Sequence, residues 1–181
     1  MYTRTGGTWS LQAVLNAPPD DPMSLLVRGY PFRVALDGDL LVVSANITLL
    51  GVLDNMKSAV YMFRRNGQQW SQEANIVVDE TNGLELSLAV SNDRVAIGVP
   101  AEQAVHVYSW NGGLWTQTGF LQPSNLDAGD GFGSAVAFSG NTLVVGSPSE
   151  DSAATGINAN QADNSAFGAG AAYVFVENGG W

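Results

Sequence analysis

Short apolar runs alternate with tight polar turns along this chain, and the pattern recurs three times. In its clearest copy, an apolar run over 135–138 is followed by Ser139-Gly140-Asn141 and then by a second run over 143–145. Turn residues of this kind tolerate a positive φ, so each pair of runs predicts a β-hairpin. The runs are nearly continuous in Val, Leu and Ala, which favours strands buried on both faces between stacked sheets.

Two other stretches align with residues 131–148 without a gap. The three copies begin at Gly29, Gly83 and Gly131. Their spacing is roughly 50 residues, and a period of that size indicates blades, solenoids or arrays rather than one irregular domain.

A second hairpin follows each first one. Its first strand is apolar, its turn contains Asn-Gly, and its second strand begins at a tryptophan; the copies cover 59–70, 104–115 and 171–181. Two hairpins per period make four antiparallel strands, which is the content of one propeller blade. The sequence therefore predicts an all-β fold: a β-propeller segment of about three four-stranded antiparallel blades, forming part of a ring.

The copies also set the repeat boundaries within a single propeller segment over 1–181. Repeats 1, 2 and 3 cover 29–82, 83–130 and 131–181, and residues 1–28 hold the end of a preceding repeat and a linker. The stretch from Tyr2 to Trp9 matches the turn and tryptophan of a second hairpin, which is typical of an excerpt from a longer array. Since propellers use about four to eight blades, we expect further blades of a parent protein, or self-association, to complete the ring.

One motif carries a family resemblance. Phe132-Gly133, followed after a hairpin by Gly146-Ser147-Pro148, is similar to the FG-GAP motif of the integrin-alpha-type β-propeller. The stretch 149–166 and the following Gly-Ala-Ala-Tyr-Val-Phe resemble the bacterial extracellular branch of that family. Tyr30-Pro31 and Leu84-Glu85 replace Phe-Gly in the other repeats. The resemblance implies a non-catalytic interaction or adhesion module at an extracellular or cell-surface location.

The links between hairpins vary most in length. The link is Ala101-Glu102-Gln103 in repeat 2, but it covers 46–58 in repeat 1 and 149–170 in repeat 3. Antiparallel strands place these links on one face of the repeats and the tight turns on the other. Length variation on one face is typical of the binding face of a repeat protein.

Charge points to the same face. The formal net charge is −10, from 17 acidic and seven basic residues, and its excess lies in or beside the long links. Such a field repels nucleic acid and anionic membranes and attracts cations or a basic partner. It also keeps an exported protein soluble, and both interpretations stay open. The acidic loop face, which we expect to bind a protein or a glycan, comprises Asp54, Glu102, Asp127, Asp130, Glu150, Asp151 and Asp163.

Calcium is the one cofactor that the sequence brings into question. The integrin-like branch carries a D-x-N-x-D-G loop after its Phe-Gly, whereas this chain has Ser139-Gly140-Asn141-Thr142 there, so the usual calcium site of the family is missing. Ca²⁺ takes about six to eight oxygen ligands. Asp127, Asp130, Asp151 and Asp163 could supply a substitute site, or such side chains could cap their own turns.

Candidates for catalysis are few. The chain has no cysteine, no G-x-S-x-G elbow and a single histidine, His106, which stands where the other copies have tyrosine. We therefore predict that the protein is not an enzyme and has no catalytic residues. Carboxylate pairs leave a carbohydrate-active enzyme or a sugar-binding accessory propeller as the alternative.

The five tryptophans divide into two groups. Trp9, Trp70, Trp115 and Trp181 recur at equivalent positions, which favours packing between blades over sugar stacking. Trp110 has Arg65 as its counterpart in repeat 1, so it is the candidate for ligand stacking. No apolar run approaches the roughly 18 residues of a membrane span, and residues 1–30 lack the pattern of a signal peptide.

Overall fold

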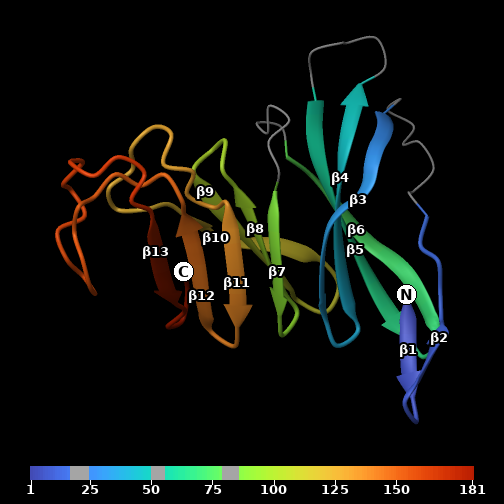
Figure 1. Cartoon of the computed structure of the whole chain (residues 1–181). Coiled ribbons are helices and arrows are strands. Elements are labelled where there is room, and N and C mark those ends of the chain that lie inside the picture. The colour runs from blue at the N-terminus through green and yellow to red at the C-terminus, as the bar shows by residue number, and fades with distance from the viewer. Residues whose placement is uncertain (17–24, 50–55, 79–85) are drawn as a thin grey trace. The chain divides into compact units, whose positions relative to one another are not determined.

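The computed structural model describes residues 1–16, 25–49, 56–78 and 86–181. These ranges form thirteen β-strands without a helix, which confirms the prediction of an all-β fold. Accordingly, the described ranges contain no helix long and apolar enough to cross a membrane. The chain divides into two compact units, unit 1 over Met1–Val78 and unit 2 over Asp79–Trp181 (Figure 1).

Unit 1 contains a two-stranded and a four-stranded antiparallel sheet. The first is the hairpin of β1 (Tyr2–Thr5) and β2 (Thr8–Leu11). The second has the order β3-β4-β5-β6 and consists of β3 (Leu25–Asp37), β4 (Leu40–Leu49), β5 (Met56–Asn66) and β6 (Gln69–Val78). Neighbouring strands follow one another in the chain, so this sheet joins the two predicted hairpins of repeat 1.

Unit 2 contains a four-stranded and a three-stranded antiparallel sheet. The sheet of repeat 2 consists of β7 (Ser87–Ser91), β8 (Arg94–Val99), β9 (Ala104–Trp110) and β10 (Trp115–Leu121). The sheet of repeat 3 consists of β11 (Ala135–Ser139), β12 (Thr142–Ser147) and β13 (Ala171–Val176). The predicted hairpins of repeat 2 and the first hairpin of repeat 3 are therefore present.

The number of strands per sheet differs in part from the expectation of three four-stranded sheets. Two sheets have four strands, but the sheet of repeat 3 has three. Trp181, which the pattern placed at the start of a fourth strand, lies outside the sheet and packs into the core of unit 2.

The links of unit 2 lie at the opposite end of its strands from the tight turns. Figure 1 shows the turns 91–94 and 139–142 at one end of the sheets and the links 122–134 and 148–170 at the other. The strands alternate in direction, so this arrangement follows from the antiparallel order. In unit 2 the links therefore gather at one end, as the pattern predicted.

The core of unit 2 lies between its two sheets. Phe132 is fully buried there, and its ring meets Tyr173 and Phe175 edge to face at centroid distances of 5.3 and 6.1 Å. The sheet of repeat 2 contributes apolar side chains from several of its strands to the same cluster. They are Ala89, Ala96, Val105, Val107 and Leu121.

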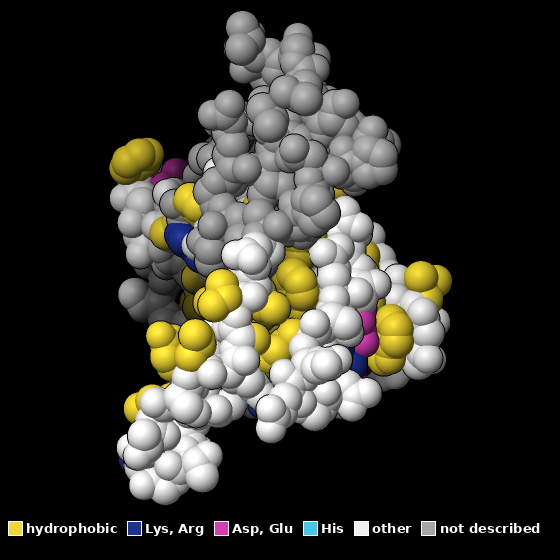
Figure 2. Space-filling view, turned by 90° about the vertical axis from the view of Figure 1, so that its right-hand side faces the viewer, with side chains coloured by type: hydrophobic (Ala, Val, Ile, Leu, Met, Phe, Trp, Pro, Cys, Tyr) yellow, Lys and Arg dark blue, Asp and Glu magenta, His cyan; other side chains and the backbone are white. Residues whose placement is uncertain are grey.

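Unit 1 has its own core on β4 and β5. Leu41, Val43, Tyr61 and Phe63 are buried in it, and Met1, Leu15 and Trp70 pack against them. Other apolar side chains stay exposed on this unit, and Figure 2 shows hydrophobic groups gathered across the side that carries β1 and β2. Exposed large hydrophobic residues of unit 1 include Trp9, Leu11, Val14, Val34 and Leu36.

Candidate interaction site on the loop face of unit 2

The Phe132-Gly133 turn fastens the two sheets of unit 2 together. Gly133 has a φ of +92°, and a Cβ at this position would lie 2.8 Å from the carbonyl oxygen of Ala104. The Ser87 hydroxyl donates a hydrogen bond of 2.7 Å to the carbonyl of Gly133. Glycine is required here both by the backbone conformation and by the close approach of the neighbouring sheet.

The Gly146-Ser147-Pro148 segment is tied to the residue that opens this turn. Ser147 is almost fully buried, and its hydroxyl donates to the carbonyl of Asp130 over 3.0 Å. The backbone N–H of Ser149 donates to the same carbonyl, also over 3.0 Å. These bonds hold the start of the long link 149–170 against the turn.

Two backbone hydrogen bonds close the base of the long link. Ala166 N donates to the carbonyl of Asp151, and Gly170 N donates to the carbonyl of Glu150, each over 2.8 Å. The Asp151 carboxylate accepts a further bond of 2.7 Å from Gly168 N. The link therefore leaves and rejoins the sheet through a narrow hydrogen-bonded neck.

Glu150 is a buried carboxylate with its own partners. Only 2% of its surface is exposed, and its oxygens accept hydrogen bonds from Asn125 Nδ2 at 2.9 Å and from Ser152 N at 3.0 Å. The Asn125 amide oxygen accepts a bond of 2.8 Å from the Tyr173 hydroxyl. Burial raises the pKa of that Tyr173 hydroxyl. Asn125 thus joins the link between repeats 2 and 3 to the long link and to β13.

Asp130 is buried in an acidic neighbourhood. It is 5% exposed, and burial is the main cause that raises the pKa of its carboxyl group. The negative charges of Asp127, Glu150 and Asp151 raise it further. The structure thus brings four of the predicted acidic residues close enough to influence one another.

The remaining carboxylates of the proposed calcium set accept hydrogen bonds from the long link. Asp127 accepts from Asn164 Nδ2 at 2.8 Å, and Asp163 accepts from the backbone N–H of Ser165 at 3.1 Å. In the ranges that the structure describes, no three His, Cys, Asp or Glu side chains stand in a group that could hold a metal ion. Calcium binding by these residues therefore stays a prediction.

Glu102 lies in the short link of repeat 2, and Asp54 lies outside the described residues. The Glu102 carboxylate is 2.8 Å from His106 Nε2, and the His106 ring meets Phe120 edge to face at 5.1 Å. His106 therefore packs and bonds within the sheet of repeat 2.

A cleft of about 890 Å³ lies between the long link and β13. Glu150 and Ser152 line it together with Tyr173 and Phe175. Two large apolar side chains of the long link are almost fully exposed, Ile157 at 93% and Phe167 at 96%. This end of unit 2 thus combines carboxylates, a cleft and exposed apolar groups.

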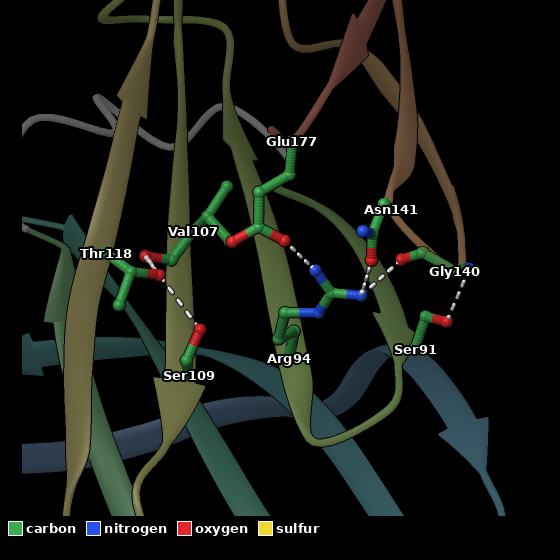
Figure 3. A network of polar contacts seen from close by, with 8 residues as sticks. All are labelled: Ser91, Arg94, Val107, Ser109, Thr118, Gly140, Asn141 and Glu177. Carbon is green, nitrogen blue, oxygen red and sulfur yellow. Dashed lines mark hydrogen bonds and ion pairs between the residues drawn. The ribbon is translucent and has the colours of Figure 1, made fainter. Parts of the chain in front are cut away.

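The tight-turn end of unit 2 carries a different polar network (Figure 3). Arg94 on β8 binds Glu177, the carbonyl of Gly140 and, at 3.1 Å, the Asn141 side chain, all of which belong to the sheet of repeat 3 or its turns. Ser91 accepts a hydrogen bond of 3.1 Å from Gly140 N. These contacts link the two sheets at the end opposite the cleft.

Trp110, the candidate for ligand stacking, also lies at the tight-turn end. Its ring is half-buried and tilted against Trp115 at a centroid distance of 5.7 Å. The structure thus places it at the opposite end of β9 from the links, away from the acidic residues of the loop face.

Comparison with known families bears on the part of the chain that holds repeat 3. The model of the FG-GAP repeat family matches residues 115–175, a range that holds the Phe132-Gly133 turn, the Gly146-Ser147-Pro148 segment and the long link. The chain carries an FG-GAP repeat. The FG-GAP repeat family is a non-catalytic repeat family, and the motif that suggested it here is the turn that fastens the sheets of unit 2. No curated protein matches the sequence.

Two residues of the loop face escaped the sequence reasoning. Asn125 bonds to Glu150, to the carbonyl of Gln161 at 2.8 Å and to Tyr173, partners that are 25, 36 and 48 residues away. Gln103 donates to the carbonyl of Asp127, also from a distant link. Neither residue lies in a local motif, so the sequence held no signal for them.

Proposed function

We propose that this chain is a non-catalytic interaction module of the β-propeller type, which binds a protein partner through its acidic loop face. The family resemblance supports an extracellular or cell-surface location for such a module. The observation that carries the proposal is the composition of the loop end of unit 2. Asp127, Asp130, Glu150 and Asp151 lie near one another there, Glu150 lines the cleft, and Ile157 and Phe167 of the long link are exposed.

This composition defines the chemistry of the partner. Exposed apolar side chains ringed by polar groups are typical of contact sites. The carboxylates add a negative field that attracts basic groups and speeds their encounter. The proposed partner therefore presents an apolar group flanked by lysine or arginine.

A displayed library of random peptides tests this proposal directly. Selection on the immobilised chain, with counter-selection on the double variant Ile157→Ser, Phe167→Ser, should enrich peptides that are basic and contain a large apolar residue. Their binding should weaken as salt is raised from about 0.05 to 0.5 M, because salt screens exposed charges. Enrichment of neutral or acidic peptides, or of peptides that bind the double variant equally well, would count against the loop face.

The sugar-binding alternative predicts a different result. Binding on a glycan array that disappears with Trp110→Ala, and persists in the Ile157→Ser, Phe167→Ser variant, would assign the function to the tight-turn end instead.

A calcium titration completes the test of this face. A site in the acidic loops predicts that millimolar calcium, but not magnesium, raises the melting temperature by binding the folded state. Asp151→Asn with Asp163→Asn should abolish that shift. An equal shift with both ions would indicate general screening of the acidic surface.

A further inference from the structure

The two sheets of unit 2 show what one repeat places on the next. Four apolar residues of the sheet of repeat 2 face the sheet of repeat 3 and are at most 8% exposed. They are Ala89 and Ala96 on β7 and β8, and Val105 and Val107 on β9. Covering this face is what holds the core of unit 2 together.

The equivalent face of the sheet of repeat 3 is open. The repeat alignment places Ala137, Val144, Ala172 and Val174 at the same four positions. Ala137 and Ala172 are exposed, Val144 is half-buried and Val174 is 64% exposed. We call these four residues the open face; the same sides of β11, β12 and β13 carry no charged residue.

A pair of equivalent glycines, one on each face, differs in what lies beside it. A Cβ at Gly98 in repeat 2 would overlap the carbonyl oxygen of Gly133, because the next sheet sits directly on it. Gly146 is its counterpart in repeat 3, and a Cβ there would meet only ordinary contacts with Ala135, the nearest at 3.4 Å. The open face thus has space beside Gly146 for a neighbouring backbone, at the position where Gly98 already contacts one.

Unit 1 carries the side chains that fit such a face. In unit 2, Val136 and Phe138 on β11 pack into the cluster with the sheet of repeat 2. Their counterparts in repeat 1 are Val34 and Leu36 on β3, which are 62% and 55% exposed. Among the described residues, these two side chains of unit 1 lack the cover that their counterparts in repeat 3 have. The rest of the matching face, at Leu41, Val43, Tyr61 and Phe63, is already buried, with Met1 and Leu15 packed against it.

Charge does not oppose the fit. Arg94 bridges the two sheets of unit 2 to Glu177, and the counterparts of Arg94 and Glu177 in the proposed contact are Thr142 and Arg65. Arg65 is already paired with Asp39 of its own unit at 2.6 Å. The contact would therefore bury no charge that lacks a partner.

We propose that the open face of the sheet of repeat 3 binds β3 of unit 1 in a second copy of this chain. The association is head to tail and repeats, at Val34 and Leu36 of β3, the contact that Val136 and Phe138 of β11 make with the sheet of repeat 2. It joins two different surfaces, so each copy can bind one neighbour at its open face and another at its β3, and the association either closes into a ring or extends into a filament.

The absence of cysteine allows a direct test by cross-linking. In unit 2 the Ser91 hydroxyl accepts a hydrogen bond from Gly140 N, and the equivalent pair across two copies is Ser139 and Gly38. Mild oxidation of the variant Ser139→Cys, Gly38→Cys should give disulfide-linked dimers or higher species. Gly67→Cys in place of Gly38→Cys is the matched control, since both glycines lie in open turns with φ of +62° and +55°.

Light scattering of the full chain provides the second measurement. The wild-type chain should show at least a dimeric mass at micromolar concentration, and Val174→Asp should weaken the association about tenfold or more, because it buries a charge in an apolar contact. Gly146→Val should weaken it too, while Val77→Asp, at another exposed valine, should not. A monomeric wild-type mass, or equal cross-linking of the two cysteine variants, would overturn the proposal. Val174 also lines the cleft of the loop face, but Gly146, Ser139 and Gly38 do not. The Gly146→Val and cysteine variants therefore separate a failure here from a failure of the peptide selection.

Discussion

Equivalent core residues of the two units are buried by different parts of the chain. Leu41 in unit 1 and Leu143 in unit 2 stand at the same position of the repeat, and both are buried. In unit 2 the cover is a whole neighbouring sheet, closed by the buried Phe132. In unit 1, Met1 and Leu15 pack against the cluster. The repeat thus specifies an apolar face, and different segments cover that face in the two units.

The start of each repeat shows the same difference in the backbone. In repeat 1 the Phe-Gly position lies inside β3, where the pairing with β4 jumps from Arg28–Asn46 to Arg33–Ser44. In repeat 3 the chain instead makes the Phe132-Gly133 turn before β11 begins. Regular pairing is interrupted in both repeats, so the irregularity belongs to the position. Only in repeat 3 do Phe132 and Gly133 occupy this position, and their contacts attach the repeat to the sheet of repeat 2.

Removing the aromatic ring of Phe132 should produce the largest effect. Phe132→Ala is expected to lower the free energy of unfolding by about 3 to 5 kcal/mol, because it leaves a cavity among Tyr173, Phe175 and the sheet of repeat 2. Phe167→Ala, at a side chain that is 96% exposed, should change it by less than about 0.5 kcal/mol. Denaturant melts measure both. Equal losses would show that Phe132 does not close the core.

Substitution of the equivalent glycines should give the second-largest effect on stability. Gly98→Ala should destabilise the chain by about 2 to 3 kcal/mol, because the added methyl overlaps Gly133 and Ser87. Gly146→Ala should change stability by less than about 0.5 kcal/mol, since its nearest neighbour is at an ordinary distance. Similar melts for the two variants would mean that the sheets of repeats 2 and 3 do not meet as described.

Removing the ion pairs at the tight turns should give a smaller difference in stability between the two units. Arg94→Met should cost about 1 to 2 kcal/mol, because it leaves the half-buried Glu177 and the Gly140 carbonyl without this donor. Arg65→Met in unit 1 should cost less than about 1 kcal/mol, since its partner Asp39 is 57% exposed. Thermal melts in low and high salt give the comparison, and a greater salt sensitivity of Arg94→Met would argue that its network is solvated.

Asp130 should give the smallest effect, and one that depends on pH. Burial raises the pKa of its carboxyl group, so the charged form lowers the stability of the fold above that pKa. Asp130→Asn removes this cost and should stabilise the chain by up to about 1 kcal/mol at pH 7. The gain should shrink as the pH falls through that pKa and should vanish below the ordinary carboxyl value of 3.8, where Asp130 is protonated in the folded and the unfolded chain alike. A gain that is constant from pH 7 to 4 would assign it to packing instead of charge.

The sequence predicted the hairpins well because their signals are local. A turn such as Ser139-Gly140-Asn141 between two apolar runs specifies β11 and β12 without help from distant residues. The position of Trp181 depends instead on Gly119, since a Cβ there would lie 2.9 Å from its ring. Nothing near Trp181 in the sequence reveals this contact, because Gly119 belongs to the preceding repeat.

The candidate site was predicted only in outline for the same reason. Antiparallel order was enough to place Glu150 and Asp163 at the link end of unit 2. Which carboxylates are buried, which are capped and which lie near one another depends on Asn125 and on the closure of a 22-residue link, 149–170. Those contacts join residues that are far apart in the sequence, so the spacing of residues in the sequence does not determine them.

The hydrogen-bonded neck of the long link has a consequence for how such a protein changes over evolutionary time. Its two backbone bonds hold Ala166 and Gly170 beside Asp151 and Glu150, whatever residues the link contains beyond them. Codons inserted or deleted between Ala153 and Gln161 would lengthen or shorten the link without unpairing β12 from β13, and the entropic cost of extra length grows slowly. Recognition can thus drift through insertions and deletions while the sheet is inherited unchanged. The same stretch would accept a grafted epitope in a laboratory.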